Sequence, residues 1–298
     1  MSFSPSAIVS VRPVTLPAPG RGLDLQLRVS APVIGRELPI IVFSHGFGSS
    51  MDGYAPLVDY WAARGFVVIQ PTHLDSRRLG LADDDPRRPE IWRFRVRDLT
   101  RALDQLDALE AAVPGLAGRV DRSRIALAGH SFGAQSSSLL LGARMVANGP
   151  GEDLRDDRIQ AGLLLAAAGR GGDDLSAFAK EHLPYLNSSF EHLTTPTLVV
   201  AGDNDRSPLT VRGPDWFTDP YTLSPGAQGL LTLFGGEHLL GGISGYDAKE
   251  TTDENPERVA LVQRMTWAFL QSALNPGDVA WRDACAGLPD AHGRVDRK

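Results

Sequence analysis

Apolar segments alternate with amphipathic segments along most of the chain. Residues 38–43 and 66–69 are continuous apolar runs, which are typical of parallel strands buried on both faces. Residues 91–113 instead carry apolar side chains at helical spacing, and Pro114-Gly115 follows as a stop signal. Further apolar runs that predict strands lie at residues 123–128, 161–168, 197–201 and 230–234. This alternation predicts an α/β fold, with a mostly parallel, doubly wound sheet and helices on both faces.

The beginning and the end of the chain show different patterns. Residues 7–14 and 23–29 alternate apolar and polar side chains, which predicts an antiparallel pair of strands at the start. Helices are predicted at residues 57–63 and 134–146. Near the other end, Asn255-Pro256 supplies an N-cap and a first-turn proline, and it predicts the start of a final long helix.

The length of 298 residues suits one large α/β domain. We predict that residues 1–274 form this domain, and that residues 275–298 form a polar C-terminal extension with a short helix and a loose end. Residues 75–89 are rich in Asp, Arg and Pro and are predicted to be a loop. Only a short stretch separates the strands predicted at residues 161–168 and 197–201, so we expect an open cleft without a large lid domain.

Charge and composition limit the kinds of molecule that this protein is expected to bind. The chain has 30 basic and 36 acidic side chains, a net charge of −6 and no basic patch, so nucleic acid is not expected as a partner. The N-terminus lacks the basic and apolar regions of an export signal, and no apolar run approaches the ~20 residues of a membrane span. A cytoplasmic protein is expected, unless a signal has been trimmed. The single cysteine, Cys285, excludes an internal disulfide and has no predicted role.

The strongest chemical motif is the pentapeptide Gly129-His130-Ser131-Phe132-Gly133. It follows a predicted strand and precedes a predicted helix, which is the setting of a nucleophile elbow. Small residues two positions on either side of the serine let the strand and the helix approach closely and relieve the sharp turn. We predict Ser131 as a catalytic nucleophile; the alternative is a surface serine in a glycine turn.

A serine nucleophile needs a base, and in chains with this elbow the order is serine, acid, histidine. Of the seven histidines, only His238 and His292 follow a plausible acid. His292 lies in the polar tail, whereas His238 directly follows the strand predicted at residues 230–234, behind two glycines that allow a sharp turn. We therefore predict His238 as the general base; the alternative is a surface histidine in a glycine loop.

The acid is expected after the strand predicted at residues 197–201. The turn Gly202-Asp203-Asn204-Asp205 offers two aspartates. Asp205 lies three residues past the glycine and is predicted to hold the imidazole and stabilise its charged form. Asp203, the alternative acid, would then point outward or cap the turn.

An oxyanion hole requires two backbone N–H groups near the nucleophile. We predict the amide of Phe132, which follows Ser131, and the amide of Phe47, in the loop after the first parallel strand. His45 in that loop is predicted to be structural. His73 and His130 are candidate substrate contacts, although a structural role is favoured for His73. No group of His, Cys or carboxylate residues has the spacing of a metal site.

With these pieces placed, the chain resembles members of the α/β-hydrolase fold over residues 35–272. It is most similar to the branch that holds chlorophyllases, platelet-activating-factor acetylhydrolases, cutinase-like polyester hydrolases and dienelactone-hydrolase relatives. Dienelactone hydrolases use a cysteine nucleophile where this chain has Ser131, and cutinase-like enzymes often have a disulfide that this chain cannot form. The motifs that carry the resemblance are Ser44-His45-Gly46-Phe47, residues 61–68, the elbow, Asn204-Asp205 and Gly235-Gly236-Glu237-His238.

The resemblance and the motifs together predict a serine carboxylic-ester hydrolase that needs no cofactor or metal. The expected substrate is a small-molecule or polymeric ester. A thioesterase or peptidase that uses the same residues is one alternative. A ligand-binding protein that has the fold without catalysis is another. The physiological ester and the oligomeric state are not predicted.

Overall fold

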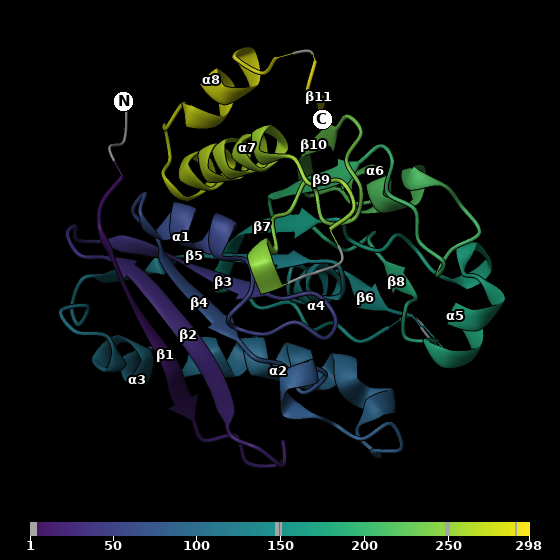
Figure 1. Ribbon diagram of the computed structural model, residues 1–298, viewed down its shortest axis with the longest axis horizontal. Helices are drawn as coiled ribbons and strands as arrows, with labels where there is room; N and C mark the ends of the chain where they lie inside the picture. Colours follow the sequence, from purple (N-terminus) through teal and green to yellow (C-terminus); the bar gives the residue numbers. More distant parts are fainter. Residues whose placement is uncertain (1–4, 147–148, 150, 248–250, 290) are drawn as a thin grey trace.

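The computed structural model describes residues 5–146, 149, 151–247, 251–289 and 291–298, and its centre is a nine-stranded sheet (Figure 1). The sheet order is β1-β2-β4-β3-β5-β7-β9-β10-β11. The strands of this sheet are β1 (Ile8–Leu16), β2 (Leu25–Pro32), β3 (Leu38–Ser44), β4 (Val67–Pro71), β5 (Val120–His130), β7 (Ile159–Leu165), β9 (Thr197–Gly202), β10 (Ala227–Leu233) and β11 (Gly293–Arg297). A small second sheet pairs β6 (Arg144–Met145) with β8 (Ser188–Ser189).

The middle of the large sheet is parallel and its edges are antiparallel. Strands β4, β3, β5, β7, β9 and β10 pair in parallel, so their carboxyl ends share one edge. The opening pair β1–β2 is antiparallel, as the alternating pattern predicted, and so are β2–β4 and β10–β11. This is the mostly parallel sheet of an α/β-hydrolase fold, and it places the loops after β3, β5, β9 and β10 at one edge.

Helices cover both faces of the sheet (Figure 1). One face packs against α2, α3 and α4, and the other packs against α1 and α7. The helices are α1 (Ala55–Ala62), α2 (Ile91–Asp104), α3 (Leu106–Ala112), α4 (Phe132–Leu140), α5 (Ala177–His182), α6 (Asp219–Thr222), α7 (Pro256–Leu274) and α8 (Ala280–Ala286). Among the helices of the described residues, none has both the length and the apolar character to cross a bilayer.

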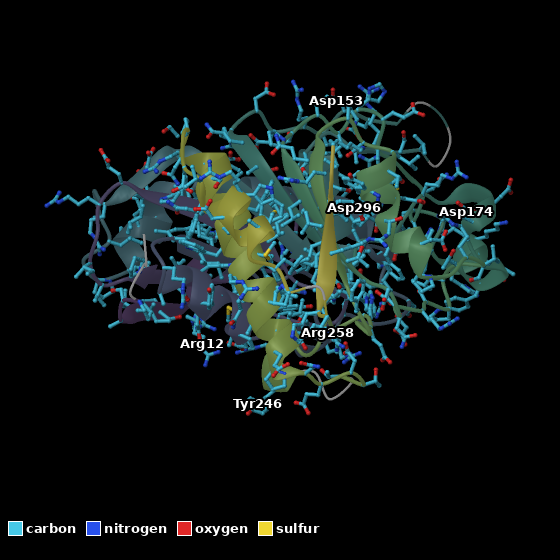
Figure 2. The ribbon with its side chains drawn as sticks, turned by 90° about the horizontal axis from the view of Figure 1, so that it is seen from above. Arg12, Asp153, Asp174, Tyr246, Arg258 and Asp296 are labelled. Atoms are coloured by element: carbon cyan, nitrogen blue, oxygen red, sulfur yellow. The ribbon has the colours of Figure 1, made fainter. Side chains whose placement is uncertain are left out.

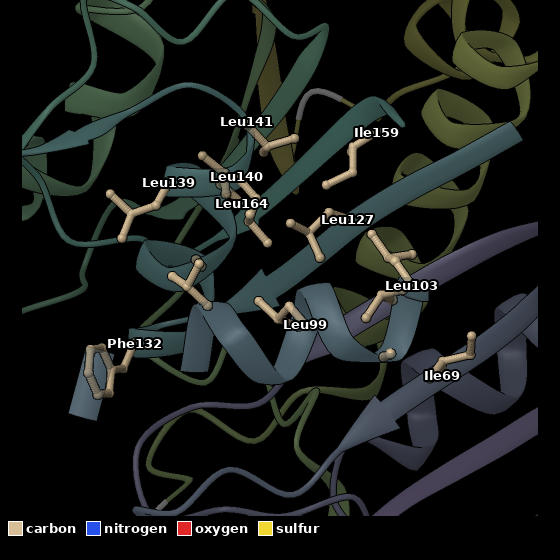
Figure 3. Packing of buried hydrophobic residues seen from close by; sticks show 14 of the residues in the cluster. Ile69, Leu99, Leu103, Leu127, Phe132, Leu139, Leu140, Leu141, Ile159 and Leu164 are labelled. Atoms are coloured by element: carbon tan, nitrogen blue, oxygen red, sulfur yellow. The ribbon is translucent and has the colours of Figure 1, made fainter. Parts of the chain in front are cut away.

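The apolar strands divide their side chains between two cores. In β3, Ile40 and Val42 face the core under α2 and α4, whereas Ile41 and Phe43 face the core under α1 and α7. Figure 3 shows the first of these cores, where Leu99 and Leu103 of α2 lie near Leu127 of β5. Burial on both faces explains why the central strands are continuous apolar runs without alternation.

Two predicted helices differ from the structure. The helix predicted at residues 91–113 divides into α2 and α3 at Gln105, which has a non-helical backbone (φ −117°, ψ 31°). The helix predicted at residues 134–146 ends at Leu140. Gly142 follows with φ +115°, and a Cβ atom there would lie 2.4 Å from the His192 carbonyl oxygen. Gly142 N–H donates to the Leu139 carbonyl oxygen and Ala143 N–H to that of Ser138, so this helix ends in a glycine C-cap, a local signal that the predicted helix ran past.

The strand predicted as the last one, at residues 230–234, is followed by β11 near the C-terminus. This strand pairs along β10. Helix α8 packs on α7, where the rings of Trp281 and Phe269 are nearly perpendicular, with centroids 5.5 Å apart. Seen from above, β11 with Asp296 runs beside the C-terminal helices (Figure 2). The polar, alternating side chains of β11 suit a sheet edge, which explains why the apolar pattern missed it. The division into a domain of residues 1–274 and an extension of residues 275–298 stays a prediction.

Candidate active site

Ser131 lies at the sharp turn between β5 and α4. Its backbone has φ 55° and ψ −123°, a sparsely populated conformation for a residue with a side chain. The turn needs glycine on both sides: a Cβ atom on Gly129 would lie 2.3 Å from the Gly133 carbonyl oxygen, and one on Gly133 would lie 2.0 Å from the Ser44 carbonyl oxygen. The Ser131 side chain does not cap α4, so its hydroxyl is available to other partners.

The structure brings Ser131, His238 and Asp205 together. His238 Nε2 lies 2.8 Å from Ser131 Oγ, and His238 Nδ1 lies 2.9 Å from Asp205 Oδ2. Asp205 is fully buried, whereas 40% of the His238 side chain is exposed. A carboxylate can only accept, so Nδ1–H donates to Asp205 and leaves Nε2 free to accept the serine proton. This geometry can withdraw a proton from Ser131.

Asp203 has a different position from Asp205. Its side chain is exposed, and Asp203 Oδ1 accepts a 2.7 Å hydrogen bond from the Gly235 backbone N–H. The Asn204 N–H donates to the Gly236 carbonyl oxygen at 3.0 Å in the same turn. Asp203 therefore joins the turn after β9 to the turn after β10, and its side chain does not contact the imidazole of His238.

An aspartate that the sequence did not indicate, with an almost inaccessible side chain, holds the loop of His238. Asp253 Oδ2 accepts hydrogen bonds from the backbone N–H groups of Glu237 and Gly241, at 2.9 and 3.0 Å. Arg258 of α7 (labelled in Figure 2) pairs with the same oxygen at 2.9 Å and donates to the Phe234 carbonyl oxygen. Both ends of the turn that carries His238 are thereby tied to the start of α7.

The loop after β3 is held from below by α2. The Gly46 carbonyl oxygen accepts from His45 Nδ1–H at 2.7 Å and from Arg95 Nη2 at 3.3 Å. In a trans peptide the N–H points opposite to the carbonyl, so the Phe47 N–H points away from the buried guanidinium of Arg95. The Phe132 N–H is the first of α4 and has no intrahelical acceptor. These are the two amides predicted for an oxyanion hole.

A buried ion pair anchors this loop. Arg95 pairs with Asp75 through two hydrogen bonds of 2.8 and 2.6 Å, and both side chains are almost completely inaccessible. Asp75 also accepts from the Gly48 N–H at 3.3 Å, and Arg95 donates to the His45 carbonyl oxygen at 2.8 Å. Burial raises the pKa of Asp75, but the charge and hydrogen bonds of Arg95 outweigh it and hold that pKa well below its ordinary value.

We expect Arg95→Met to destabilise the protein by about 3–5 kcal/mol, because it leaves Asp75 buried without its partner. Urea denaturation measures this loss as a lower midpoint at an unchanged slope. Arg93→Met is the matched control on the same helix, because its ion pairs with Glu90 and Glu152 lie at the surface and contribute about 0–1 kcal/mol. Equal losses in the two variants would contradict the anchoring role of Arg95.

The two histidines considered as substrate contacts, His73 and His130, are buried beneath the site. His73 donates from Nδ1 to Asp98 at 3.1 Å and accepts at Nε2 from the Ser44 hydroxyl at 3.0 Å. His130 lies between Tyr54 and the His238 backbone. Neither ring lines the cavity beside Ser131. Burial lowers the pKa of both rings well below the ordinary value, helped by the charge of Arg95 at His73 and by the neighbouring His238 at His130, so the neutral forms are favoured.

His45 is structural, as predicted. Its Nε2 accepts from the His73 backbone N–H at 3.0 Å, so the proton lies on Nδ1 and is donated to the Gly46 carbonyl oxygen. His292, the other histidine considered as a base, lies exposed in the turn before β11. Asp98, which accepts from His73, and Arg95, which donates to the His45 carbonyl oxygen, both lie on α2. In the sequence they look like ordinary polar positions of a helix, and only their buried contacts distinguish them.

An apolar cavity of about 370 Å³ opens beside Ser131 and His238. Among the described residues that line it, none is Asp, Glu, Lys or Arg. Phe132 stacks on Tyr185 across one wall, with ring centroids 5.6 Å apart, and burial raises the Tyr185 pKa to about 12. The apolar and aromatic lining residues are Phe47, Phe132, Ala166, Ala168, Phe178, Leu183, Tyr185, Leu186, Leu209, Trp216 and Phe217.

One arginine links two loops beside this cavity through ion pairs. Arg212 pairs with Asp174, Asp215 and Asp219 at 3.0, 2.7 and 2.8 Å (Asp174 is labelled in Figure 2). Asp219 is nearly inaccessible, and its Oδ2 also accepts from the Arg170 backbone N–H. These ion pairs join the segment before α5 to the segment that carries Trp216. Two loops that form this part of the cavity wall are therefore held together.

Comparison with known proteins agrees with the motifs. Residues 9–147 match the model of the Chlorophyllase family, slightly less than half of the chain. The chain has the α/β-hydrolase fold and is similar to chlorophyllases.

The chain is also 25% identical over 224 residues to platelet-activating factor acetylhydrolase of Bos taurus, a match that covers 60% of this chain and 47% of the bovine protein. A match to the Cavia porcellus protein of the same name, 25% identical over 134 residues, covers 33% of this chain and 30% of that one.

These comparisons confirm the resemblance to chlorophyllases and platelet-activating-factor acetylhydrolases, while the resemblance to cutinase-like and dienelactone-hydrolase enzymes stays a prediction. The chain spans about half or less of the length of the curated relatives that it matches. The family match includes the loop of Phe47 and the elbow of Ser131, but not Asp205 or His238. The assignment of the acid and the base therefore depends on geometry. No group of three or more His, Cys, Asp or Glu among the described residues could hold a metal ion.

Proposed function

We propose that this protein is a serine hydrolase of the esterase type, which cleaves carboxylic esters through an acyl-enzyme. The observation that carries the proposal is the hydrogen-bonded chain Ser131–His238–Asp205, with distances of 2.8 and 2.9 Å, at the mouth of an apolar cavity. The similarity to chlorophyllases and to proteins named acetylhydrolases supports it. An intact chain of this kind argues against a protein that only binds a ligand.

In the first half of the reaction, Ser131 Oγ attacks the ester carbonyl carbon while His238 Nε2 accepts the hydroxyl proton. The carbonyl oxygen gains a negative charge, which the amides of Phe47 and Phe132 stabilise. The tetrahedral intermediate then breaks its bond to the leaving oxygen, and His238 returns the proton to the departing alcohol. Asp205 stabilises the imidazolium throughout and keeps its own charge.

In the second half, water attacks the acyl-enzyme carbonyl and His238 accepts one of its protons. The intermediate then releases the carboxylic acid, and His238 returns a proton to Ser131 Oγ. Among the described residues, no Asp, Glu, Lys or Arg lines the cavity, so it suits an uncharged, apolar part of the substrate. We propose a small-molecule or polymeric ester with such a part, and no metal or cofactor takes part in these steps.

Thioesters and amides could react through the same groups, so the test compares three substrates with one acyl group: an ester, a thioester and an anilide. We expect the ester to be hydrolysed with the highest kcat/KM, and a fluorophosphonate probe to label Ser131. A preference for the thioester or the anilide would contradict the assigned bond type. No turnover of any substrate together with no labelling would indicate a binding protein.

A further inference from the structure

A continuous hydrogen-bonded chain runs under the candidate active site, from the loop after β3 to the loop after β10. The Gly46 N–H lies 3.1 Å from Tyr54 Oη, and Tyr54 Oη lies 2.8 Å from His130 Nδ1. The other ring nitrogen, His130 Nε2, lies 2.7 Å from the His238 carbonyl oxygen. Two buried side chains thus connect the loop of Phe47 to the backbone of His238.

The two ends of this chain determine the direction of the bonds that they make. The Gly46 N–H can only donate, so Tyr54 Oη accepts from it and its own proton is available for His130 Nδ1. The His238 carbonyl can only accept, so His130 Nε2 carries the ring proton. A neutral ring with its proton on Nε2, which the lowered pKa of His130 favours, then accepts from the Tyr54 hydroxyl at Nδ1.

We propose that Tyr54 and His130 are positioning residues, which hold the predicted oxyanion loop and the base His238 at the correct distance and orientation to each other. This inference depends on the proposed function, because the two elements it couples are the ones assigned to stabilise the oxyanion and to move the proton. Tyr54 and His130 are both buried and neither lines the cavity, so they act through Gly46 and His238 and do not touch substrate.

The packing around the chain leaves little freedom. A Cβ atom on Gly46 would lie 2.9 Å from Tyr54 Oη and 3.2 Å from His130 Nδ1, so only glycine lets the loop approach both groups. Tyr54 itself has φ 66°, a left-handed conformation that is unfavourable for an aromatic residue. That conformation precedes α1, and the Tyr54 N–H is held by the Ser244 carbonyl oxygen at 2.9 Å.

The neutral state of His130 also matters for the base. The rings of His130 and His238 have centroids 5.0 Å apart, and a charge on the first would oppose the imidazolium that forms on the second. Burial, and then the neighbouring His238, lowers the pKa of His130 to about 3. Arg95 of α2 donates to the Gly46 carbonyl at 3.3 Å and thus holds the opposite side of the same residue.

The test begins with Tyr54→Phe, which keeps the ring packed against Phe43 and removes only Oη. We expect kcat for a neutral ester to fall about 10- to 100-fold while KM stays within about twofold, because reacting groups are misplaced and the cavity is unchanged. His130→Gln retains an N–H group able to reach the His238 carbonyl, so it should keep more activity than His130→Leu. The loss in Tyr54→Phe/His130→Leu should be smaller than the product of the single losses.

Thr266→Val is the matched control. It removes a fully buried hydroxyl of α7 that accepts from the Trp61 indole N–H at 3.1 Å and donates to the Val262 carbonyl oxygen at 2.6 Å, contacts that lie outside the candidate site. We expect it to lower stability about as much as Tyr54→Phe, with kcat unchanged. Equal kcat in Tyr54→Phe and the wild type, or an equal fall in kcat in both variants, would overturn the positioning role.

A second measurement separates this inference from the proposed function. If the wild type neither hydrolyses esters nor reacts with a fluorophosphonate, the proposed function fails, and ¹⁵N NMR of the histidine rings still tests the chain of bonds. We expect His130 to remain in the neutral Nε2–H form from pH 5 to 8, and its Nδ1 resonance to shift in Tyr54→Phe. A His130 that titrates in this range, or an Nδ1 signal unchanged in Tyr54→Phe, would overturn the inference.

Discussion

Replacing Ser131 by alanine is expected to lower kcat for ester hydrolysis by roughly 10⁴- to 10⁶-fold and to leave the fold intact. The variant loses the oxygen that lies 2.8 Å from His238 Nε2, so no acyl-enzyme can form. The side chain does not cap α4, and alanine preserves the Cβ atom, so the strained turn keeps its packing. Steady-state turnover of an ester substrate measures the loss, and circular dichroism checks the fold.

The control for this prediction is the double variant Ser131→Ala/His238→Ala. Because the two residues act as a unit, His238→Ala alone should lose about as much as Ser131→Ala, and the double variant should lose little more. Activity close to the wild type in well-folded Ser131→Ala would exclude the proposed mechanism. Multiplicative losses in the double variant would show instead that His238 acts independently of Ser131.

The second large effect is expected at Asp205. Asp205→Asn should reduce kcat by about 10⁴-fold, because a neutral amide does not stabilise the imidazolium and favours the wrong tautomer of His238. The carboxylate is fully buried and its Oδ2 lies 2.9 Å from His238 Nδ1. Its Oδ1 is also buried and meets no donor among the described residues, so this side chain is directed at His238.

Asp203→Asn is the matched control, two residues away in the same turn. Its side chain is exposed and accepts only from the Gly235 N–H among its described contacts, a bond that an asparagine oxygen can also accept. We expect kcat to stay within a few-fold of the wild type. An inactive Asp203→Asn together with an active Asp205→Asn would reverse the assignment of the acid.

Local patterns in the sequence predicted the central strands and singled out the residues of the candidate site. The apolar runs predicted β3, β4, β5, β7, β9 and β10, because strands buried on both faces must be apolar throughout. The Asn255 N-cap was also predicted, and its side chain accepts from the Arg258 N–H at the start of α7. Ser131, His238 and Asp205 were singled out by spacing from glycines and strand ends, and the structure brings their side chains together. Their catalytic roles stay predictions.

The sequence alone therefore determined the type of fold and the residues at the ends of its strands, since both depend on short stretches of chain. Only the tertiary structure decided which groups support them. The ion pair of Arg95 with Asp75, the contact of Asp253 with the loop of His238, and the burial of His130 join residues that are distant along the chain. A polar residue on a helix or in a loop looks the same in sequence whether it is exposed or buried. Its role is decided by the partner that folding places against it.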